Sequence, residues 1–392
     1  MKLLYVVNQA SFFVSHRLPL ALEAQRLGFD VAVACGRDTG EEKLIEAGVM
    51  VHTIRLSRSG TNVFAELRTL RELLRLYRAF DPDIVHHVTI KPVLYGTIAA
   101  RLARVPAVVN AIPGLGFVFT RRGALARVRR QIINQFYRLA LRHDNMRVIF
   151  QNGEDRESFV NASVVRRPET VLIRGSGVDL TQFEASPEPD TPLVFVLVAR
   201  MLRDKGVFEF VAAAEQLKKR YPDWRFWLVG DVDPGNPVSL TLAQLQAWDT
   251  EGAVEWLGQR DDVSDILRSC HVLCLPSYYR EGLPKSLLEA AASERAIIAS
   301  RVAGCLEVVT DGVTGLIVEP RDVGDLVVAM QRLGTDKALR ERLARAARNK
   351  AEALFSVDEV VQDTFIVYEQ LSPDDSTESA EADAFARQSQ TQ

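Results

Sequence analysis

Cysteine is scarce in this chain: its 392 residues include only four, at positions 35, 270, 274 and 305. Their spacing fits no zinc site and their density is far too low for a disulfide scaffold, so reduced thiols are expected. No apolar run is long enough to span a bilayer. The first apolar run ends at Asn8, which is too early for a secretory signal and fits a first buried strand. These absences exclude disulfide-rich secreted domains and membrane-spanning proteins, and they predict a cytoplasmic location.

Length and composition predict a soluble protein of two domains, each able to bury its own core. Hydrophobic residues make up 47% of the chain and charged residues 25%, as in ordinary globular proteins. Strand-length apolar segments alternate with helical patterns in two series, which predicts two parallel sheets with crossover helices. The expected strands are 2–7, 31–35, 49–54, 84–88, 107–111, 147–150 and 171–173, then 193–199, 225–229, 254–257, 272–275, 297–300 and 316–318.

Two polar segments mark boundaries in this pattern. The Pro-rich stretch 186–192 has the composition of a linker. From Ser372 onward the residues are too polar to form a core. We therefore expect an N-terminal domain over 1–185, a C-terminal domain over 186–356, a last helix over 357–371 and a disordered tail over 372–392.

Positive charge is concentrated in the first part of the chain. Residues 1–150 contain 22 Lys and Arg and 11 Asp and Glu, a net charge of +11; the remainder holds 26 basic and 40 acidic residues, a net charge of −14. In the helical pattern 64–78, four arginines share one face and apolar side chains another. In residues 121–142, seven arginines accompany an apolar stripe, Leu125, Val128, Ile132, Phe136 and Leu139.

Basic amphipathic helices of this kind are typical of binding to a membrane surface. The expected contacts are Arg122, Arg127, Arg129 and Arg130. The alternative for both helices is an apolar stripe that packs into the domain core, with the arginines as its solvated face. RNA binding is not expected, because the basic segments lack interleaved aromatic residues.

The segment Glu281-Gly-Leu-Pro-Lys-Ser-Leu-Leu-Glu289 carries the strongest functional signal. Pro284 suits the first position of a helix, and the free backbone N–H groups of a first helical turn bind anions such as phosphate. Two carboxylates, Glu281 and Glu289, flank that helix start and can accept hydrogen bonds from hydroxyls. The combination predicts a pocket for a phosphorylated sugar or a nucleotide sugar, and a solvated surface helix is the plainer alternative.

A second segment also has the pattern of a ligand site. Residues 193–199 form an apolar run of strand length, and a short basic loop with Arg200, Lys205 and Gly206 leads into an apolar-periodic helix. Such a loop lies at the carboxyl end of a buried parallel strand, where α/β proteins bind ligands. Arg200 and Lys205 are therefore expected to face an anion from the side opposite the helix at 284, and an ordinary βα loop with solvated charges is the plainer alternative.

These motifs resemble those of the retaining nucleotide-sugar glycosyltransferases of GT-B fold, family 4. The resemblance rests on the strand that ends in Arg200, on Lys205-Gly206, on Glu281-Gly-x-Pro-x-x-x-x-Glu289, on Asp311-Gly-Val-Thr-Gly315 and on Gly177-Val-Asp179, and it covers roughly residues 1 to 370. Within the family, Ser15-His16-Arg17 and Gly114-Leu-Gly116 resemble bacterial enzymes that extend undecaprenyl-diphosphate-linked sugars. N-acetylgalactosaminyltransferases of N-glycan, O-antigen or capsule assembly are examples.

The resemblance implies an α/β chain of GT-B fold: two Rossmann-like domains face each other across a cleft, and the last helix crosses back to the first domain. It implies transfer of a sugar, with retention, from a nucleoside-diphosphate donor, expected to be UDP-linked, to an undecaprenyl-diphosphate-linked saccharide. The implied partners are that donor, the lipid-diphosphate-linked glycan and an anionic membrane surface, with no nucleic acid. The expected location is peripheral, on the inner face of the cell membrane.

The resemblance also assigns roles. Arg200, Lys205 and Glu281 form the expected catalytic set, in which the two cations neutralise the departing diphosphate and Glu281 holds donor-sugar hydroxyls. Glu289 is expected to hold the ribose, and the backbone of Gly282, Leu283, Pro284 and Lys285 to receive the diphosphate or the sugar. No metal or cofactor is expected, because Arg200 and Lys205 remove the need for one. Asp81-Pro-Asp83 matches the short acidic motif of metal-dependent transferases, but it directly precedes a strand and fits a helix stop and strand entry.

The first domain gives weaker signals. The expected acceptor contacts are His16, Arg17, Gly114 and Gly116, since glycines let a backbone approach a ligand closely. Many family members carry a histidine after the strand that here precedes Pro113; this chain has none there, so that role does not transfer. Of His86 and His87, at the end of a strand, one is expected to face the cleft and the other the core.

Two alternative functions remain. A nucleotide-sugar epimerase of GT-B fold would need an acid/base set around the sugar and would not need the basic amphipathic stretches. A catalytically silent subunit of a glycan assembly complex is the other, and the intact set Arg200, Lys205, Glu281 and Glu289 argues against it.

Overall fold

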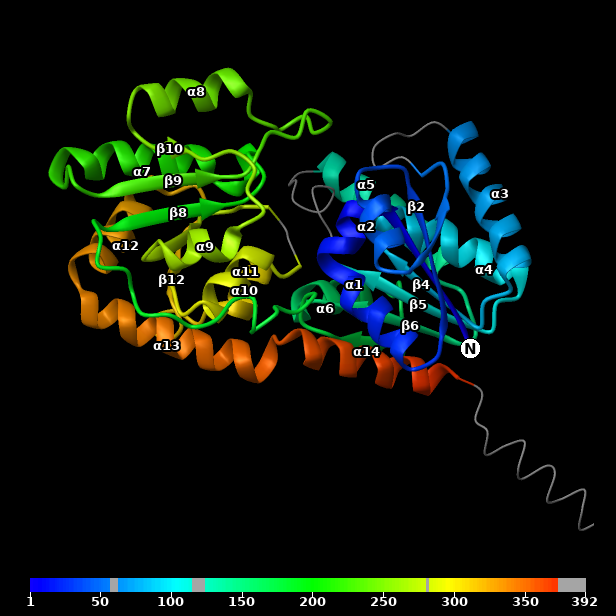
Figure 1. Ribbon diagram of the computed structural model, residues 1–392. Coiled ribbons are helices and arrows are strands. Elements are labelled where there is room, and N and C mark those ends of the chain that lie inside the picture. Colours follow the sequence, from blue (N-terminus) through cyan, green and yellow to red (C-terminus); the bar gives the residue numbers. More distant parts are fainter. Residues whose placement is uncertain (57–62, 115–123, 280–281, 373–392) are drawn as a thin grey trace, which may run out of the picture.

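The computed structural model describes residues 1–56, 63–114, 124–279 and 282–372. They form two sheets with helices on both faces, side by side in Figure 1. The first sheet has the strand order β3-β2-β1-β4-β5-β6-β7 and the second the order β10-β9-β8-β11-β12-β13. All paired strands in both sheets run parallel, as the alternating pattern of the sequence predicted.

The first sheet occupies residues 2–172. Its strands are β1 (Lys2–Gln9), β2 (Asp30–Gly36), β3 (Met50–Thr53), β4 (Ile84–Val88), β5 (Ala107–Ile112), β6 (Met146–Phe150) and β7 (Thr170–Leu172). Its helices are α1 (Ala10–Arg26), α2 (Gly40–Glu46), α3 (Val63–Phe80), the π-helix η1 (Pro92–Gly96), α4 (Thr97–Ala103), α5 (Ala124–Ala140), α6 (Gly153–Asn161) and the short η3 (Arg167–Glu169).

The second sheet begins at residue 194. Its strands are β8 (Val194–Val198), β9 (Arg225–Val229), β10 (Glu255–Trp256), β11 (Val272–Leu275), β12 (Ala296–Ser300) and β13 (Leu316–Val318). Its helices are η4 (Arg203–Lys205), α7 (Val207–Arg220), α8 (Leu242–Thr250), α9 (Val263–Arg268), α10 (Lys285–Ala292), α11 (Ala303–Val308), α12 (Val323–Thr335) and α13 (Lys337–Leu354). Each strand bound of both sheets lies within two residues of the expected one.

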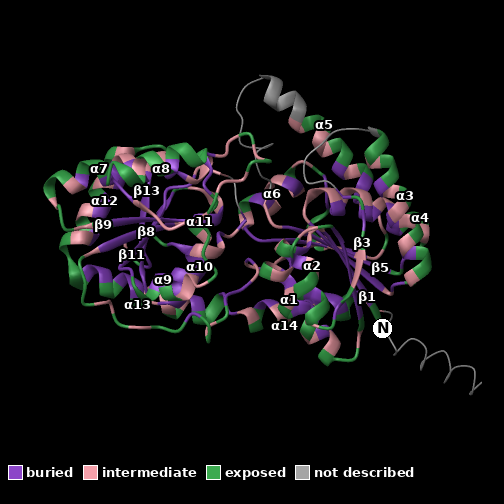
Figure 2. Cartoon of the chain, turned by 45° about the horizontal axis from the view of Figure 1, so that its top comes forward, coloured by how far each residue is buried: buried purple, intermediate pink, exposed green. Residues whose placement is uncertain are grey.

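Both sheets are buried on both faces. Along β1, Leu4 and Val6 point into one core cluster, while Leu3 and Tyr5 point into another. The strands accordingly appear as a buried interior beneath helices with exposed outer faces in Figure 2. Because helices cover both faces, the carboxyl ends of the strands are the natural place for a ligand.

The two histidines of β4 correct one expectation. His86 and His87 are both fully buried, so neither faces a cleft. His86 shares a 2.6 Å hydrogen bond with the hydroxyl of Tyr368, and His87 shares hydrogen bonds of 2.8 and 2.9 Å with Asn110 and Tyr77. The expectation fails because β4 is a central strand whose two faces are both covered, so alternation only moves a side chain from one core to the other.

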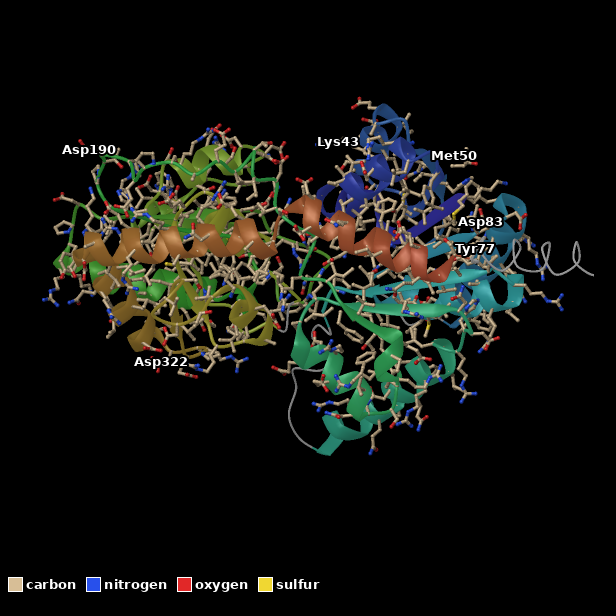
Figure 3. All side chains as sticks on the ribbon, turned by 90° about the horizontal axis from the view of Figure 1, so that it is seen from below. Lys43, Met50, Tyr77, Asp83, Asp190 and Asp322 are labelled. Atoms are coloured by element: carbon tan, nitrogen blue, oxygen red, sulfur yellow. The ribbon has the colours of Figure 1, made fainter. Side chains whose placement is uncertain are left out.

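The last described helix, α14 (Val357–Leu371), returns to the first sheet, as the resemblance implied. Val360, Val367 and Leu371 belong to the core on the α1 side of that sheet. The Tyr368 hydroxyl donates to the hydroxyl of Tyr5 at 3.2 Å. In Figures 1 and 3, α13 runs along the second sheet and α14 continues along the first.

The Pro-rich stretch 186–192 is held against the second sheet rather than being a free linker. Arg295 donates hydrogen bonds to the Ser186 carbonyl at 2.8 Å and to its hydroxyl. Arg340 forms a buried ion pair of 2.9 Å with Glu188. Composition indicated a non-helical connection, but it could not reveal two arginines that are distant in sequence. Across the described part of the chain, no helix combines the length and apolar character needed to cross a membrane.

Candidate active site

Two loops at the carboxyl ends of neighbouring strands β8 and β11 are joined by hydrogen bonds. The Asp204 carbonyl accepts from the backbone N–H groups of Tyr278 and Tyr279 at 3.0 and 3.1 Å and from the Ser277 hydroxyl at 3.1 Å. Gly206 has φ +79°, and a Cβ there would lie 2.2 Å from the Pro276 carbonyl oxygen. The glycine therefore allows the Lys205 loop to pack against the loop that leads to residue 281.

The two predicted cations differ in their surroundings. Arg200 pairs with Asp233 at 2.6 Å, and its side chain is 44% exposed. The ammonium of Lys205 lies 5.8 Å from the centre of the Tyr279 ring. Asp233, in the loop after β9, was missed from the sequence, although its place beyond a strand end could have pointed to it. This ion pair holds the Arg200 guanidinium beside Asp233, so an incoming anion must compete with that carboxylate for the guanidinium.

Helix α10 begins one residue later than expected. Pro284 has φ −67° and ψ 119°, so it is the residue before the first helical position, and Lys285 begins the helix. The extended ψ value places Pro284 outside the helix, although its φ suits a helix start. Of the two glutamates of this motif, Glu281 lies outside the described residues, and Glu289 is buried on the second turn of α10.

Glu289 is an unusual carboxylate because it is buried. Burial raises its pKa, and the nearby Lys285 ammonium acts in the opposite direction. The two charged groups lie 3.4 Å apart along the helix. A buried carboxylate next to a helix N-terminus is held in place by its surroundings, and it is suited to accept hydrogen bonds from hydroxyls of a ligand.

The first domain meets the start of α10 directly. The backbone N–H of Leu283 donates to the Gln151 side-chain oxygen at 3.1 Å. The Lys285 ammonium donates to the carbonyl and the hydroxyl of Ser15 at 3.2 and 3.4 Å. Gln151 follows β6 and Ser15 lies on α1, so carboxyl-end segments of both sheets converge here. Neither residue was predicted; for Gln151, the signal was its position immediately after a strand.

The contact at Gly282 is especially tight. A Cβ at this position would lie 1.8 Å from the Pro113 carbonyl oxygen and 2.1 Å from the Gln151 side-chain oxygen. Pro113 follows β5, which is next to β6 in the first sheet. The predicted donor-binding residues Gly282, Leu283, Pro284 and Lys285 are thus brought against the first domain, with Glu289 one turn further along the helix.

The predicted acceptor-binding residues lie in different surroundings, and His16 lies beside the start of α10. His16 stacks on Phe12 with ring centres 4.1 Å apart, and one ring nitrogen lies 3.1 Å from the Phe12 carbonyl oxygen. Burial, with the charges of Lys285 and Arg17, lowers its pKa to about 3, so the ring is neutral at physiological pH. The neighbouring Ser15 contact places His16 beside the α10 start.

Arg17 is placed differently, because its guanidinium is buried inside the first domain. Its side chain is 3% exposed, and the nearby side chains include Tyr5 of β1 and Tyr368 of α14. Burial is the largest effect on its pKa and lowers it. Burial beside residues of β1 and α14 favours a role in supporting the packing of α1 and α14. An acceptor contact by Arg17 stays a prediction.

The remaining predicted residues lie in and after the loop that follows β5. Gly114 has φ +152°, a conformation that side-chain-bearing residues rarely adopt. Gly116 and Arg122 lie outside the described residues, and so do the side chains of Arg127 and Arg129, whose backbone begins α5. Arg130 is half-buried. Within the described residues, no three His, Cys, Asp or Glu side chains are grouped closely enough to hold a metal ion.

The structure distinguishes the two amphipathic helices. On α5, the apolar residues Ile132, Phe136 and Leu139 are 53%, 62% and 54% exposed, whereas Tyr137 on the opposite face is buried. On α3, the apolar face does pack into the core, with Leu73 and Tyr77 buried and Leu70, Leu74 and Leu76 against the same cluster. The alternative of an apolar stripe packed into the core is therefore correct for α3. On α5, the described residues of the predicted apolar stripe are exposed instead.

Comparison with known proteins gives a consistent picture. Residues 179–350 match the family model described as glycosyl transferases group 1, and residues 2–152 match glycosyl transferase 4-like proteins. The chain is 28% identical over 364 residues to the N,N'-diacetylbacillosaminyl-diphospho-undecaprenol alpha-1,3-N-acetylgalactosaminyltransferase of Campylobacter jejuni, covering 90% of this chain and 94% of the relative. It is 25% identical over 342 residues to the UDP-Gal:alpha-D-GlcNAc-diphosphoundecaprenol alpha-1,3-galactosyltransferase of Escherichia coli, covering 84% and 86%.

Solved structures agree with the fold. HepE of Anabaena in complex with UDP and glucose superposes with a TM-score of 0.77 at 19% identity, covering 94% of this chain and 99% of that chain. A glycosyltransferase of Rickettsia africae has the same TM-score at 17% identity, covering 95% and 99%. At these identities the likeness concerns the arrangement of the two domains.

Proposed function

We propose that this chain, which belongs to the group 1, family 4-like glycosyltransferases of GT-B fold, moves a sugar with retention from a UDP donor to an undecaprenyl-diphosphate-linked saccharide. The observation that carries the proposal is the convergence at the start of α10 of the Lys205 loop, the buried Glu289 and Gln151 from the other domain. The two relatives described above, which align over 90% and 84% of this chain, carry an undecaprenyl-diphosphate-linked sugar in their names.

In the proposed donor complex, the nucleotide lies on the second sheet beside α10. Glu289 accepts hydrogen bonds from the ribose hydroxyls, because its buried carboxylate is fixed and faces the helix start. Glu281 takes the hydroxyls of the donor sugar. The backbone of residues 282–285 holds the diphosphate or sugar, and Leu283 exchanges its present partner, Gln151, for the donor.

The leaving group determines the roles of the two cations. As the bond between the sugar and the diphosphate breaks, negative charge grows on the diphosphate, and positioned cations stabilise that charge in the transition state. Lys205 has a fixed loop for this task, while Arg200 must leave Asp233 to reach the anion. These two charges take the part that a metal ion plays in other transferases, and the proposal therefore includes no metal or cofactor.

The acceptor enters from the first domain. His16 is neutral at working pH and lies beside Lys285, so it can share a hydrogen bond with the acceptor but cannot supply a positive charge to its diphosphate. Gly114, with its unusual backbone, borders the same side of the site. His86 and His87 of β4 are buried, and they take no part in the proposed reaction.

The proposed location is the inner face of the cell membrane, with peripheral attachment through α5. The support is its outward apolar face, Ile132, Phe136 and Leu139, on a helix rich in arginine. Such helices insert apolar side chains between lipids while their cations attract anionic headgroups.

Vesicle flotation tests this attachment. Phe136→Ser should weaken binding to anionic vesicles by about tenfold, from the loss of buried apolar area, and replacing Arg127, Arg129 and Arg130 by Gln should weaken it in a salt-dependent way. Leu67→Ser is the matched control, because Leu67 is 46% exposed on the other basic helix, α3. Equal flotation of the Phe136 and Leu67 variants would contradict the proposed membrane contact of α5.

The activity is tested by a mass-spectrometric transfer assay in EDTA. UDP-, GDP- and dTDP-sugars are combined with undecaprenyl-diphosphate-linked mono- and oligosaccharides. Product from a UDP-sugar without metal supports the proposal, and a requirement for added Mg²⁺ or Mn²⁺ contradicts its metal-free form. Interconversion of the free nucleotide sugar without transfer would indicate the epimerase alternative, and full activity in vivo of Glu289→Ala would indicate a silent subunit.

A further inference from the structure

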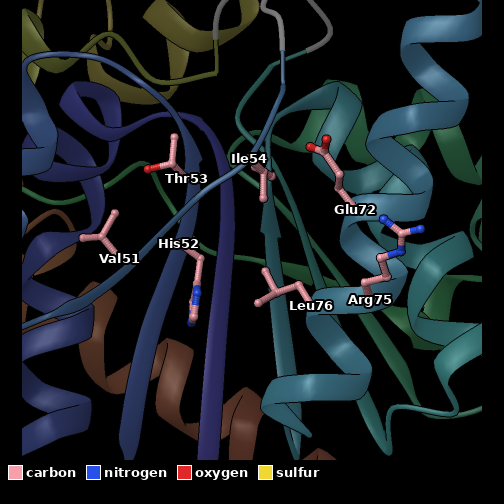
Figure 4. A pocket seen from close by; sticks show the side chains of 7 residues that line it. All are labelled: Val51, His52, Thr53, Ile54, Glu72, Arg75 and Leu76. Carbon is pink, nitrogen blue, oxygen red and sulfur yellow. The ribbon is translucent and has the colours of Figure 1, made fainter.

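A large hollow lies on the first domain at the carboxyl ends of β1, β2 and β3. Its volume is about 1020 Å³, and its lining includes Asn8 at the end of β1, Arg37 after β2, Arg55 after β3, and Phe64 and Arg68 on the first turns of α3. A smaller hollow of about 360 Å³ shares Thr53 and Ile54 with it and continues between β3 and α3 (Figure 4). None of the residues with an assigned donor or catalytic role lines either hollow.

The charge in the larger hollow is predominantly positive. Arg37, Arg55 and Arg68 are all exposed. The acidic side chain in the lining, Glu66, is occupied by Lys91 at 2.7 Å, and both of these side chains are largely buried. Glu72, which lines only the smaller hollow, lies 3.5 Å from Arg68 and accepts a hydrogen bond from the Arg55 backbone N–H. The guanidinium of Arg37 has no ion-pair partner among the described residues.

Two further features indicate a ligand rather than a solvated basic surface. The side-chain oxygen of Asn8 is buried and has no hydrogen-bond partner within the described residues. A buried polar atom without a partner is unfavourable, and a ligand can remove that cost by supplying the missing hydrogen bond. Phe64 is 84% exposed beside it, and a large aromatic side chain in that position offers a flat face to a sugar ring.

The position of the hollow relates it to the active site. Asn8 ends β1, and the next helix, α1, carries Ser15, whose carbonyl and hydroxyl contact Lys285 at the start of α10. The hollow and the Ser15–Lys285 contact therefore both lie on the carboxyl side of the first sheet, and α1 connects them. A ligand in the hollow with a further extension toward α1 would reach the transfer site.

We propose that this hollow is an acceptor subsite for an anionic saccharide, which it holds through Arg37, Arg55 and Arg68 while Asn8 and Phe64 bind the sugar ring. This inference rests on the proposed function, since it concerns the acceptor of that transfer. The anion is either the diphosphate of the lipid carrier or a carboxylate on an acceptor sugar. Guanidinium groups recognise both by paired hydrogen bonds.

Calorimetric titration tests the subsite without requiring transfer. The full chain is first saturated with UDP, which fills the donor site, and is then titrated separately with pyrophosphate and with galacturonate. Arg37→Gln and Arg68→Gln should each weaken binding of one probe by about tenfold, the order expected for a charge-assisted hydrogen bond. Arg71→Gln is the matched control, because Arg71 is an exposed arginine of α3 that lines neither hollow.

Each outcome decides the proposal. Weaker pyrophosphate binding in the two variants, with the control unchanged, assigns the hollow to the lipid diphosphate; the same pattern with galacturonate assigns it to an acidic sugar. Failure of the wild-type chain to bind either probe, or equal weakening in Arg71→Gln, overturns the subsite. Release of UDP from the donor sugar is measured in parallel. If the wild-type chain releases UDP from the donor but binds neither probe, the subsite is refuted and the proposed function is not. If the chain binds a probe but never consumes the donor, the proposed function is refuted.

Discussion

Replacement of Gly282 by Ala is the most direct way to test whether the contact between the two domains at α10 matters for catalysis. The added Cβ would lie 1.8 Å from the Pro113 carbonyl oxygen. Ordinary contact between non-bonded heavy atoms needs roughly 3.5 Å, so the two segments must move apart by about 1.7 Å. Pro113 offers a backbone atom, which no side-chain rotation can remove. Displacements of about 1 Å in an active site cost on the order of 10² in rate, and we expect a loss of at least that size in kcat.

Two controls separate domain contact from damage to the donor site. Alanine keeps the backbone N–H that residue 282 is proposed to offer the donor, so UDP affinity in Gly282→Ala should stay within about threefold of wild type. Gly153→Ala at the same interface should be active, because a Cβ there would be 3.8 Å from its nearest neighbour, Glu307. Adding Gln151→Ala should not rescue Gly282→Ala, since the Pro113 oxygen remains.

Steady-state kinetics, UDP titration and thermal unfolding of the three variants supply the measurements. The reasoning is refuted if Gly282→Ala turns over like the wild-type chain, because the close contact would then be irrelevant to the active state. Rescue by Gln151→Ala would instead show that the flexible amide, and not the backbone of Pro113, is the obstacle. Loss of UDP affinity with a lowered melting temperature would indicate local damage to the α10 start.

Three further outcomes follow from the site and its buried groups. Lys205→Ala should lower kcat by roughly 10², whereas Lys219→Ala, which removes an exposed cation of α7, should not; equal rates would exclude Lys205 from the reaction. Burial raises the pKa of Glu289, so its carboxylate should be protonated, and UDP affinity should decline, as pH falls into the acid range. Glu289→Gln should bind UDP about ten- to a hundredfold more weakly than wild type and without that pH dependence. A pH dependence of UDP affinity that persists in the variant would contradict the assignment. Burial lowers the pKa of His16 to about 3 and that of His87 to about 4. The unfolded chain therefore binds more protons between pH about 6.5 and 4, and the free energy of unfolding falls as pH is lowered through that range, by at most about 1.4 kcal/mol per pH unit for each histidine. In urea titrations, the decline should be shallower for His16→Gln than for wild type, and an equal decline would mean that folding does not lower the pKa of His16.

Strand positions could be predicted because buried parallel strands are continuous apolar runs. The residues of β5 and β12 are buried throughout, and the run of β5 ends at the turn signal Pro113-Gly114. The same continuity misled the interpretation of His86 and His87, since a strand covered on both faces has no cleft side. The start of α10 was predicted one residue early because proline suits both positions, and only its ψ angle distinguishes them.

Contacts between distant segments were beyond prediction from one sequence. The pair Leu283 and Gln151 is separated by 132 residues, and Arg200 and Asp233 by 33. The helices α3 and α5 show a related limit, because both are basic and amphipathic. Periodicity identifies an apolar face, but whether that face meets a core depends on the surrounding elements, which cover the face of α3 and leave that of α5 exposed.

The two domains are joined by contacts of unequal strength. On the α14 side, Val360, Val367 and Leu371 are buried in the first core, and burying such a side chain contributes about 1.5–3 kcal/mol. On the α10 side, the hydrogen bonds are single and polar, as between Leu283 and Gln151, and a typical one contributes only about 0.5–1.5 kcal/mol. Separation at α10 is therefore much easier than separation at α14. A donor that takes over the Leu283 N–H replaces one weak bond, so the site can open for substrate while α14 preserves the register that brings Lys285 back to Ser15.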